Sequence, residues 1–315
     1  MLAYHLPAAA EQPQLAELPV PPIQPGHVLV KVKAAGLNPL DNAIASGVVA
    51  RVMPHHYPVV LGRDAAGVIE ATGDGVEGLA VGDEVLAHIP LAPPIASGTL
   101  AEYVLVAAAN VALKPASLDF VTAAALPLSA GAATVAVEAI DPRPGDVVLV
   151  NGASGGVGSF AVQLLAARDA VVVATGTEAD VDRLIKLGAT TVVDYTRESV
   201  AKQVRLNYPG GVHALINLAG HTADMVPLAA VATGGKVVTA TRAPDADTLA
   251  AAGLTGTSIM TRPDGETLRL LAEQVATGNL SVEIDTVLPL RQVADGLATL
   301  ASGQAHGKIV ITVDA

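Results

Sequence analysis

The pattern of hydrophobic and polar positions divides the chain into two parts. In the first third, short strands such as 28–33, 66–69 and 103–106 lie between closely spaced glycine turns. The first of them alternates apolar and polar residues, as a half-buried strand does. Short strands with frequent turns are typical of a small barrel rather than a parallel sheet, so this part is predicted to be mainly β.

From Asp119 on, the pattern changes to continuous apolar runs separated by amphipathic stretches such as 157–167 and 179–187. The apolar runs lie at 147–150, 171–174, 191–193, 214–216 and 236–238. Buried strands alternating with helices are typical of a doubly wound parallel sheet.

A last predicted strand at 308–313 is expected to return to the first part of the chain. We therefore predict an α/β protein with a Rossmann domain over 120–262. A mainly β, barrel-like domain is predicted over 1–119 and 263–315. The length of 315 residues agrees with two domains.

Composition narrows the possible functions. Aromatic residues make up 2% of the chain and the formal net charge is −12, which disfavours stacking on bases and repels phosphate backbones, so no nucleic-acid partner is expected. The chain has no cysteine, which excludes disulfides and thiolate sites. The start of the chain lacks a signal-peptide pattern, and the apolar stretch 121–137 contains proline and glycine. We expect a cytoplasmic protein with no membrane segment.

The most informative segment is a glycine-rich turn. The apolar run 147–150 leads into Asn151-Gly152-Ala153-Ser154-Gly155-Gly156-Val157-Gly158, and an amphipathic stretch follows. Glycines in this order allow a backbone to approach a pyrophosphate, which binds the free N–H groups at the start of the helix. A dinucleotide is therefore the predicted cofactor.

The choice between NADH and NADPH stays open at this point. The second strand of the predicted sheet ends at the neutral residues Thr175 and Thr177. Glu178 and Asp180 follow, and either binds a free ribose or caps the next helix. No lysine or arginine stands at that point to hold a 2′-phosphate.

Further motifs run through nearly the whole chain in a fixed order. They are the segments 36–41 (GLNPLD), 58–68 (PVVLGRDAAGV), 81–85 (VGDEV), 98–103 (GTLAEY), 124–127 (AALP), 144–146 (PGD), 155–158 (GGVG), 187–189 (LGA), 193–195 (VDY) and 306–310 (HGKIV). With these motifs the chain resembles the zinc-free quinone oxidoreductases and enone reductases of the medium-chain dehydrogenase/reductase superfamily.

The resemblance implies a GroES-like catalytic domain, a Rossmann domain, an active site in the cleft between them, and a homodimer joined through the edge of the Rossmann sheet near 257–261. It implies that Asn38 and Asp41 lie near the nicotinamide and that Tyr195 lies against the adenosine ribose, which favours NADPH. Asn217 and Gly220 follow the strand that faces the nicotinamide. The pyrophosphate is held by Ser154, Gly155, Gly156 and Val157, with Thr175 and Thr177 completing the cofactor-binding set.

Two departures from related patterns bear on the chemistry. Many relatives have a lysine where Asp180 stands, so NADH remains possible beside NADPH. Zinc alcohol dehydrogenases of the superfamily have a cysteine in place of Asn38 and a histidine in place of Arg63, and without cysteine neither of their zinc sites can be built. No metal is expected. A short-chain dehydrogenase is excluded because none of the five tyrosines has a lysine four residues later.

Without a metal, conjugate reduction is the simplest chemistry, and it needs a hydrogen-bond donor for the developing enolate. Tyr57 is the candidate donor, with His55 or His56 as alternatives, unless this segment is only a surface loop. Asn38 either orients a substrate or forms a turn before Pro39, and Asp41 either touches a ligand or caps a helix.

Two further charged residues are interpreted as structural. Arg63 is expected to form an ion pair with Asp64 or Asp41. Lys308 either reaches the cofactor or is a solvated lysine at a strand edge, and the second is the expectation.

The predicted function is an NAD(P)H-dependent reductase that transfers a hydride to a small quinone or α,β-unsaturated carbonyl. An enoyl-thioester reductase, or a tailoring enoyl reductase of a biosynthetic pathway, is the enzymatic alternative. A non-catalytic NADPH-binding sensor or structural protein is the alternative from another class.

Overall fold

The computed structural model describes residues 1–220, 222–241 and 243–313. The chain forms two compact units, Met1–Gly131 with Arg262–Ala315, and Ala132–Thr261. The domain boundaries predicted from the sequence stay a prediction, because a compact unit need not fold on its own.

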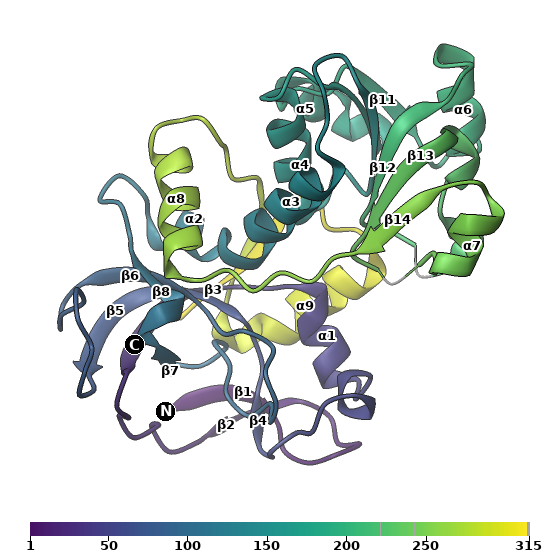
Figure 1. The fold of residues 1–315 in the computed structure, drawn as a ribbon. Helices are drawn as coiled ribbons and strands as arrows, with labels where there is room; N and C mark the ends of the chain where they lie inside the picture. The colour runs from purple at the N-terminus through teal and green to yellow at the C-terminus, as the bar shows by residue number, and fades with distance from the viewer. Residues whose placement is uncertain (221, 242, 314–315) are drawn as a thin grey trace. The chain divides into compact units, whose positions relative to one another are not determined.

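The second unit contains a parallel sheet (Figure 1). Its strand order is β11-β10-β9-β12-β13-β14 among the described residues, and each neighbouring pair is parallel. This is the order of a doubly wound dinucleotide-binding sheet, in which the chain reverses direction beside the first strand. The predicted Rossmann fold is thus confirmed. The strands are β9 (Val147–Asn151), β10 (Val171–Gly176), β11 (Thr191–Asp194), β12 (Val212–Asn217), β13 (Val231–Thr239) and β14 (Thr255–Ser258).

The central strands of this sheet are apolar throughout because both of their faces are covered. Val148, Leu149 and Val150 of β9 have no exposed surface. The accompanying helices are α4 (Gly156–Ala166), α5 (Val181–Lys186), α6 (Val200–Asn207) and α7 (Ala246–Ala251), with short 3-10 turns η3 (Glu178–Asp180), η4 (Ala223–Met225) and η5 (Leu228–Ala230). The helix α3 (Pro127–Ile140) begins in the first unit and ends in the second.

The first unit is mainly β, as predicted. Its larger sheet has the order β15-β16-β3-β5-β6-β8, with β7 also paired to β3, and a smaller sheet has the order β2-β1-β4, counting described residues only. The strands are β1 (Leu2–Leu6), β2 (Gln14–Glu17), β3 (His27–Gly36), β4 (Val59–Val60), β5 (Asp64–Thr72), β6 (Glu84–His88), β7 (Tyr103–Ala107), β8 (Val111–Leu113), β15 (Ile284–Pro289) and β16 (Lys308–Thr312).

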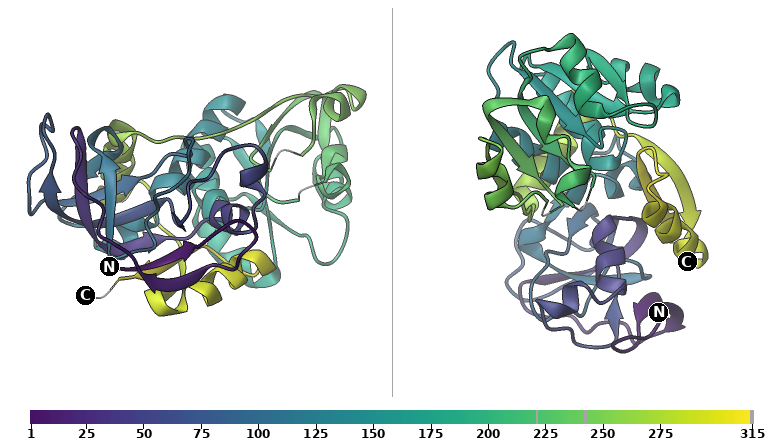
Figure 2. Two further views of the ribbon diagram at one scale, coloured as in Figure 1. Left: turned by 90° about the horizontal axis from the view of Figure 1, so that it is seen from below. Right: turned by 90° about the vertical axis from the view of Figure 1, so that its right-hand side faces the viewer.

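The last strand returns to the first unit, where β16 pairs antiparallel with β3 and parallel with β15. In both views of Figure 2 the yellow C-terminal segment lies beside the purple and blue segments of this unit. Its helices and 3-10 turns are α1 (Pro39–Ala45), α2 (Phe120–Ala124), α8 (Gly265–Ala276), α9 (Val293–Ser302), η1 (Val49–Arg51), η2 (Ala108–Asn110) and η6 (Leu290–Gln292).

Candidate functional site

The glycine-rich turn connects β9 to α4 in the second unit. Gly152 has φ +85°, a left-handed conformation that favours glycine, and Gly155 is the extended residue that precedes α4. A Cβ on Gly158 would lie 2.2 Å from the carbonyl oxygen of Gly152, so this close approach of turn and helix requires glycine. The turn therefore has the shape predicted for a pyrophosphate site.

The start of α4 offers free hydrogen-bond donors. No described residue accepts a hydrogen bond from the backbone N–H of Gly156, Val157 or Gly158, and Gly155 supplies no side-chain cap. These N–H groups carry the positive end of the helix dipole. They fit a dinucleotide pyrophosphate, and Ser154, Gly155, Gly156 and Val157 are the residues that would hold it.

The end of β10 supports this turn. The Thr175 hydroxyl accepts a hydrogen bond of 2.9 Å from the Gly152 N–H, and Thr177 donates from its N–H and its hydroxyl to Asp180 Oδ2 at 2.9 and 2.8 Å. Arg183 Nη2 donates to Asp180 Oδ1 at 2.8 Å and to the Ser154 carbonyl at 3.1 Å. The Asp180 carboxylate is buried and already bonded to its neighbours.

Arg183 is a residue that the sequence analysis missed. It stands one helical turn after Asp180, and this i, i+3 spacing is the signal that could have placed it beside the carboxylate. Its Nη1 is buried and has no hydrogen-bond partner among the described residues. A cation thus lies next to the glycine-rich turn, where the sequence had indicated only neutral and acidic groups.

The remaining predicted cofactor residues lie at the ends of β11 and β12. Tyr195 follows β11 and is 49% exposed. Asn217 is fully buried: its Oδ1 accepts from Asn151, and its Nδ2 donates to Thr239, Thr241 and the Ala243 carbonyl. Asn217 thereby ties three segments of the sheet edge together, and Gly220 turns the chain with φ +84°.

In the first unit, a buried polar cluster forms around Asn38. Its Nδ2 donates to Asp64 Oδ2 at 2.8 Å and to the Gly36 carbonyl at 3.3 Å, and its Oδ1 accepts from Lys308 Nζ at 2.7 Å. Asp64 also bonds His88 Nδ1 at 2.8 Å and accepts from the Leu128 N–H. Every polar atom of the Asn38 amide is therefore in use.

Asp41 caps the start of α1. Its Oδ2 accepts from the Asn38 N–H at 2.8 Å, while Oδ1 is buried without a partner among the described residues. Burial raises the pKa of Asp41 to about 6, although the Asn38 N–H and the Arg63 charge act in the opposite direction. Helix capping is thus the role that the hydrogen bonds of this carboxylate show.

Two sequence predictions about charged residues are wrong. Lys308 is buried, not solvated, and its Nζ donates to Asn38 Oδ1 and to the Leu37 carbonyl. Among the described residues, β16 is also not an edge strand, since it lies between β15 and β3. Arg63 forms no ion pair with Asp64 or Asp41, since Asp64 is taken by other partners. Arg63 is 2% exposed, and its Nε and Nη2 have no partner within the described residues. Burial lowers the pKa of Arg63.

Tyr57 lies apart from the hydrogen bonds of this cluster. Its ring is 5.9 Å from the His55 ring, and it lines a cavity of about 170 Å³ together with Leu6, Glu11 and Ser46. Its hydroxyl forms no hydrogen bond with a described residue. The structure thus brings Asn38 and Asp41 together and leaves Tyr57 at a separate cavity of the same unit.

Comparison with known proteins identifies the family. Residues 24–116 match the alcohol dehydrogenase GroES-like domain, and residues 187–311 match the zinc-binding dehydrogenase family. An NADPH-dependent alkenal/one oxidoreductase of Arabidopsis thaliana is 31% identical over 93% of this chain and 73% of its own length. A chloroplast envelope quinone oxidoreductase homolog of the same plant is 30% identical over 94% and 92%.

A crystal structure of an NAD-dependent alcohol dehydrogenase superposes with a TM-score of 0.87 and 32% identity, covering 100% of both chains. The chain belongs to the medium-chain dehydrogenase/reductase superfamily. The predictions of this superfamily, of a GroES-like domain and of an oxidoreductase are confirmed.

Many members of this superfamily hold zinc, but the side chains here do not fit such an ion. Within 1–220, 222–241 and 243–313, no three His, Asp or Glu side chains gather closely enough to hold a metal. Asn38 and Arg63 are poor zinc ligands, and Arg63 carries a positive charge that would repel the ion.

Among the described residues, no helix is long and apolar enough to cross a membrane.

Proposed function

We propose that this protein is a metal-free reductase that uses NADPH, with NADH as a possible substitute, to reduce a small quinone or α,β-unsaturated carbonyl. The observation that carries the proposal is the row of unpaired N–H groups at the start of α4, directly after the first strand of a doubly wound sheet. When bound, the reduced nicotinamide supplies the hydride. The names of the two Arabidopsis relatives support the acceptor class.

The second unit binds the dinucleotide in this proposal. The N–H groups of Gly156 and Val157, with the adjacent Ser154 and Gly155, hold the pyrophosphate. Arg183 supports NADPH over NADH, because its guanidinium stands beside the turn and neutralises the carboxylate that would otherwise repel a 2′-phosphate. Thr177 and Tyr195 complete the adenosine end, while Thr175, Asn217 and Gly220 hold the backbone of this edge in place.

The first unit supplies the groups for the acceptor. Since the Asn38 amide is fully hydrogen-bonded, we assign it and Asp41 a positioning role that keeps the start of α1 fixed. Tyr57 is the proposed proton donor, because its hydroxyl has no partner among the described residues and its ring lines a cavity. A phenol donates a hydrogen bond to a developing enolate oxygen.

The test is a turnover assay with purified, chelator-treated protein, in which the loss of nicotinamide absorbance is followed for NADPH and NADH in parallel. The acceptors are a set of quinones, alkyl enones and one enoyl thioester. We expect turnover that survives the chelator, faster with NADPH, and with a quinone or enone as the best acceptor. Preference for the thioester would favour the enoyl-thioester alternative, and dinucleotide binding without any turnover would contradict the proposal.

A single substitution tests the proposed proton donor. Tyr57→Phe removes one hydroxyl and keeps the ring, so we expect slower turnover with unchanged dinucleotide affinity. Equal turnover of Tyr57→Phe and the unmodified protein would remove Tyr57 from the mechanism.

A further inference from the structure

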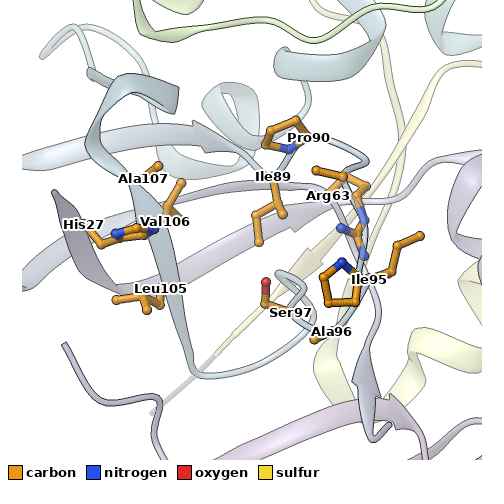
Figure 3. A pocket seen from close by; sticks show the side chains of 12 residues that line it. His27, Arg63, Ile89, Pro90, Ile95, Ala96, Ser97, Leu105, Val106 and Ala107 are labelled. Atoms are coloured by element: carbon orange, nitrogen blue, oxygen red, sulfur yellow. The ribbon is translucent and has the colours of Figure 1, made fainter. Parts of the chain in front are cut away.

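An exposed arginine of the second unit lies beside the adenosine end of the proposed cofactor site. Arg197 belongs to the segment after β11, and 66% of its side chain is exposed. Arg63 of the first unit offers a contrast. Figure 3 shows it beside a cavity of about 200 Å³, but it is 2% exposed, and the charges of Asp41 and Asp64 already act on it. Arg197 is therefore accessible to a dissolved ligand, whereas Arg63 is buried.

Two neighbouring strand ends bring Arg197 to its position. β10 and β11 pair in parallel, with Gly176 opposite Asp194. The segments that follow these strands therefore lie close together, and Arg197 forms an ion pair with Glu178, the second residue after β10. The two partners are 19 positions apart along the chain, so the residues next to Thr177 in the sequence do not reveal this cation.

A second carboxylate anchors the same guanidinium. Nε of Arg197 lies 3.1 Å from Asp194 Oδ2, while Nη2 bonds Glu178. Asp194 is itself held by Thr196, whose N–H and hydroxyl donate to Oδ1 at 2.9 and 2.6 Å. These hydrogen bonds lower the pKa of Asp194, so it is ionised at neutral pH. Arg197 can thus change the acceptor of Nη2 and keep its contact with Asp194.

The exchange of Glu178 for another anion costs little. The side chains of the pair are 66% and 82% exposed, and such a surface ion pair contributes little to stability because water screens it. A phosphate monoester carries more negative charge than a carboxylate near neutral pH. Its oxygens also match the planar fork of a guanidinium. A phosphate group placed at this edge therefore competes with Glu178 for Arg197.

The position of the pair indicates which phosphate this is. In a doubly wound sheet, the residues after the second strand contact the 2′ position of the adenosine ribose, with an acid for a free hydroxyl or an arginine for a 2′-phosphate. In this unit the second strand is β10, and Glu178 follows it directly after Thr177. Asp180 is buried and bonded to Arg183, whereas Glu178 and Arg197 are exposed at this edge.

We propose that Arg197 is a second residue that selects NADPH, because it exchanges Glu178 for the 2′-phosphate while Asp194 keeps its guanidinium in place. This assignment rests on the proposed dinucleotide site. Arg183 neutralises the buried carboxylate of Asp180, and Arg197 contacts the phosphate itself. Glu178 competes for Arg197 and so weakens NADPH binding. NADH has no 2′-phosphate and leaves the ion pair intact.

The experiment is calorimetric titration of the full chain with NADPH and with NADH, for the unmodified protein and two variants. Arg197→Gln should weaken NADPH binding by about fivefold or more, because a charge-assisted contact is lost, and should leave NADH binding unchanged. Glu178→Gln should strengthen NADPH binding by about threefold, because a competing and repelling charge is lost, again without changing NADH binding.

Lys202→Gln is the matched control. Lys202 has the same exposed fraction as Arg197, 66%, and is paired with Glu198, so its loss should change neither affinity. Equal losses of NADPH and NADH affinity in Arg197→Gln, or unchanged NADPH affinity in both Arg197→Gln and Glu178→Gln, would overturn the proposal. A protein that binds neither dinucleotide would overturn the cofactor site together with this assignment. None of these readouts uses turnover, so a failed reductase assay leaves this test intact.

Discussion

At the scale of single residues, Arg183 links the sequence of α5 to the choice of cofactor. Its guanidinium joins the Asp180 carboxylate to the Ser154 carbonyl of the glycine-rich turn. An acidic residue at this edge of a Rossmann sheet ordinarily binds the hydroxyls of a free ribose. Here the acid is buried and bonded to Arg183 and Thr177, so it is not available for that role.

We therefore predict that Arg183→Gln weakens NADPH binding by roughly tenfold or more and leaves NADH binding about the same, because one cation near the 2′-phosphate is lost. Affinities for both dinucleotides are measured by calorimetry. Lys186→Gln, which removes an exposed cation from the same helix, is the control and should change neither affinity. Equal losses for NADPH and NADH in Arg183→Gln would show that the arginine only supports the turn.

The burial of Arg63 and Lys308 could not be predicted from the sequence. Arg63 and Lys308 were interpreted from their neighbours along the chain, as an ion pair and as a solvated edge residue. In the structure, Lys308 is bonded to Leu37 and Asn38, about 270 positions away along the chain, and both Lys308 and Arg63 are buried. Hydrophobic periodicity does not indicate such burial, because it shows which face of a helix or strand is apolar on average and not whether a single charged side chain is buried.

At the scale of elements, two glycines at the junction of β9 and α4 differ in the space that a Cβ would have. A Cβ on Gly158 would lie 2.2 Å from a backbone oxygen, whereas a Cβ on Gly155 would have its nearest neighbour at 3.6 Å, an ordinary contact. We predict that Gly158→Ala lowers the free energy of unfolding by about 1–3 kcal/mol, as overpacking does. Gly155→Ala should leave that free energy nearly unchanged.

Urea unfolding of both variants without nucleotide measures this difference. Gly155→Ala is also expected to bind dinucleotide more weakly, because its new methyl group stands at the proposed pyrophosphate site. Similar stability of the two variants would contradict the turn geometry. Unchanged nucleotide affinity of Gly155→Ala would contradict the position of the pyrophosphate.

The start of α1 predicts a dependence of stability on pH. Burial raises the pKa of Asp41 from 3.8 to about 6 in the folded protein, so the folded state favours the protonated acid. The stability that this group contributes is fully present below about pH 4 and is lost as the pH rises through about 6. At about 1.4 kcal/mol per pKa unit, the loss is about 3 kcal/mol.

Asp41→Asn removes this titration and keeps an oxygen for the Asn38 N–H. We expect the stability of the unmodified protein, relative to Asp41→Asn, to fall by about 3 kcal/mol between about pH 4 and about pH 8 in urea unfolding. Asp182→Asn, at an exposed position, is the control for the loss of one surface carboxylate. A constant difference between the unmodified protein and Asp41→Asn across this range would show that Asp41 is not buried as an acid.

Elements were predicted best where their pattern was local. The five apolar runs of the second unit lie in β9 to β13, and the glycine-rich turn precedes α4. The hydrophobic pattern did not predict β14, because Thr255–Ser258 is exposed at each position and has no apolar pattern, and only the family resemblance implied a sheet edge near 257–261. Its place in the sheet comes from pairing with β13, which no local signal in the sequence reports.

At the scale of the whole molecule, the net charge of −12 opposes the binding of anions in general. The proposed pyrophosphate site overcomes this with a local feature, the free N–H groups and the positive end of the helix dipole at the start of α4.

The open edge of the parallel sheet bears on oligomeric state. Among the described residues, β14 pairs with β13 on one side only, and all four of its residues are exposed. The Ile259 N–H donates to the Thr239 carbonyl of β13, so by the alternation of a strand the N–H of Ser258 points to the open side. An unpaired strand edge readily pairs with another strand, and a symmetric pair of such edges joins two copies.

We predict a homodimer that pairs through β14. Ser258→Pro removes the outward N–H and leaves the bonds to β13, so it should convert the dimer to a monomer with an unchanged circular dichroism spectrum. Light scattering after gel filtration measures the mass, and Ser258→Ala, which keeps the N–H, should remain dimeric. A monomeric unmodified protein would refute the dimer itself. A dimeric Ser258→Pro would place the contact on another surface, and the β14 edge would then need a different explanation for its exposure.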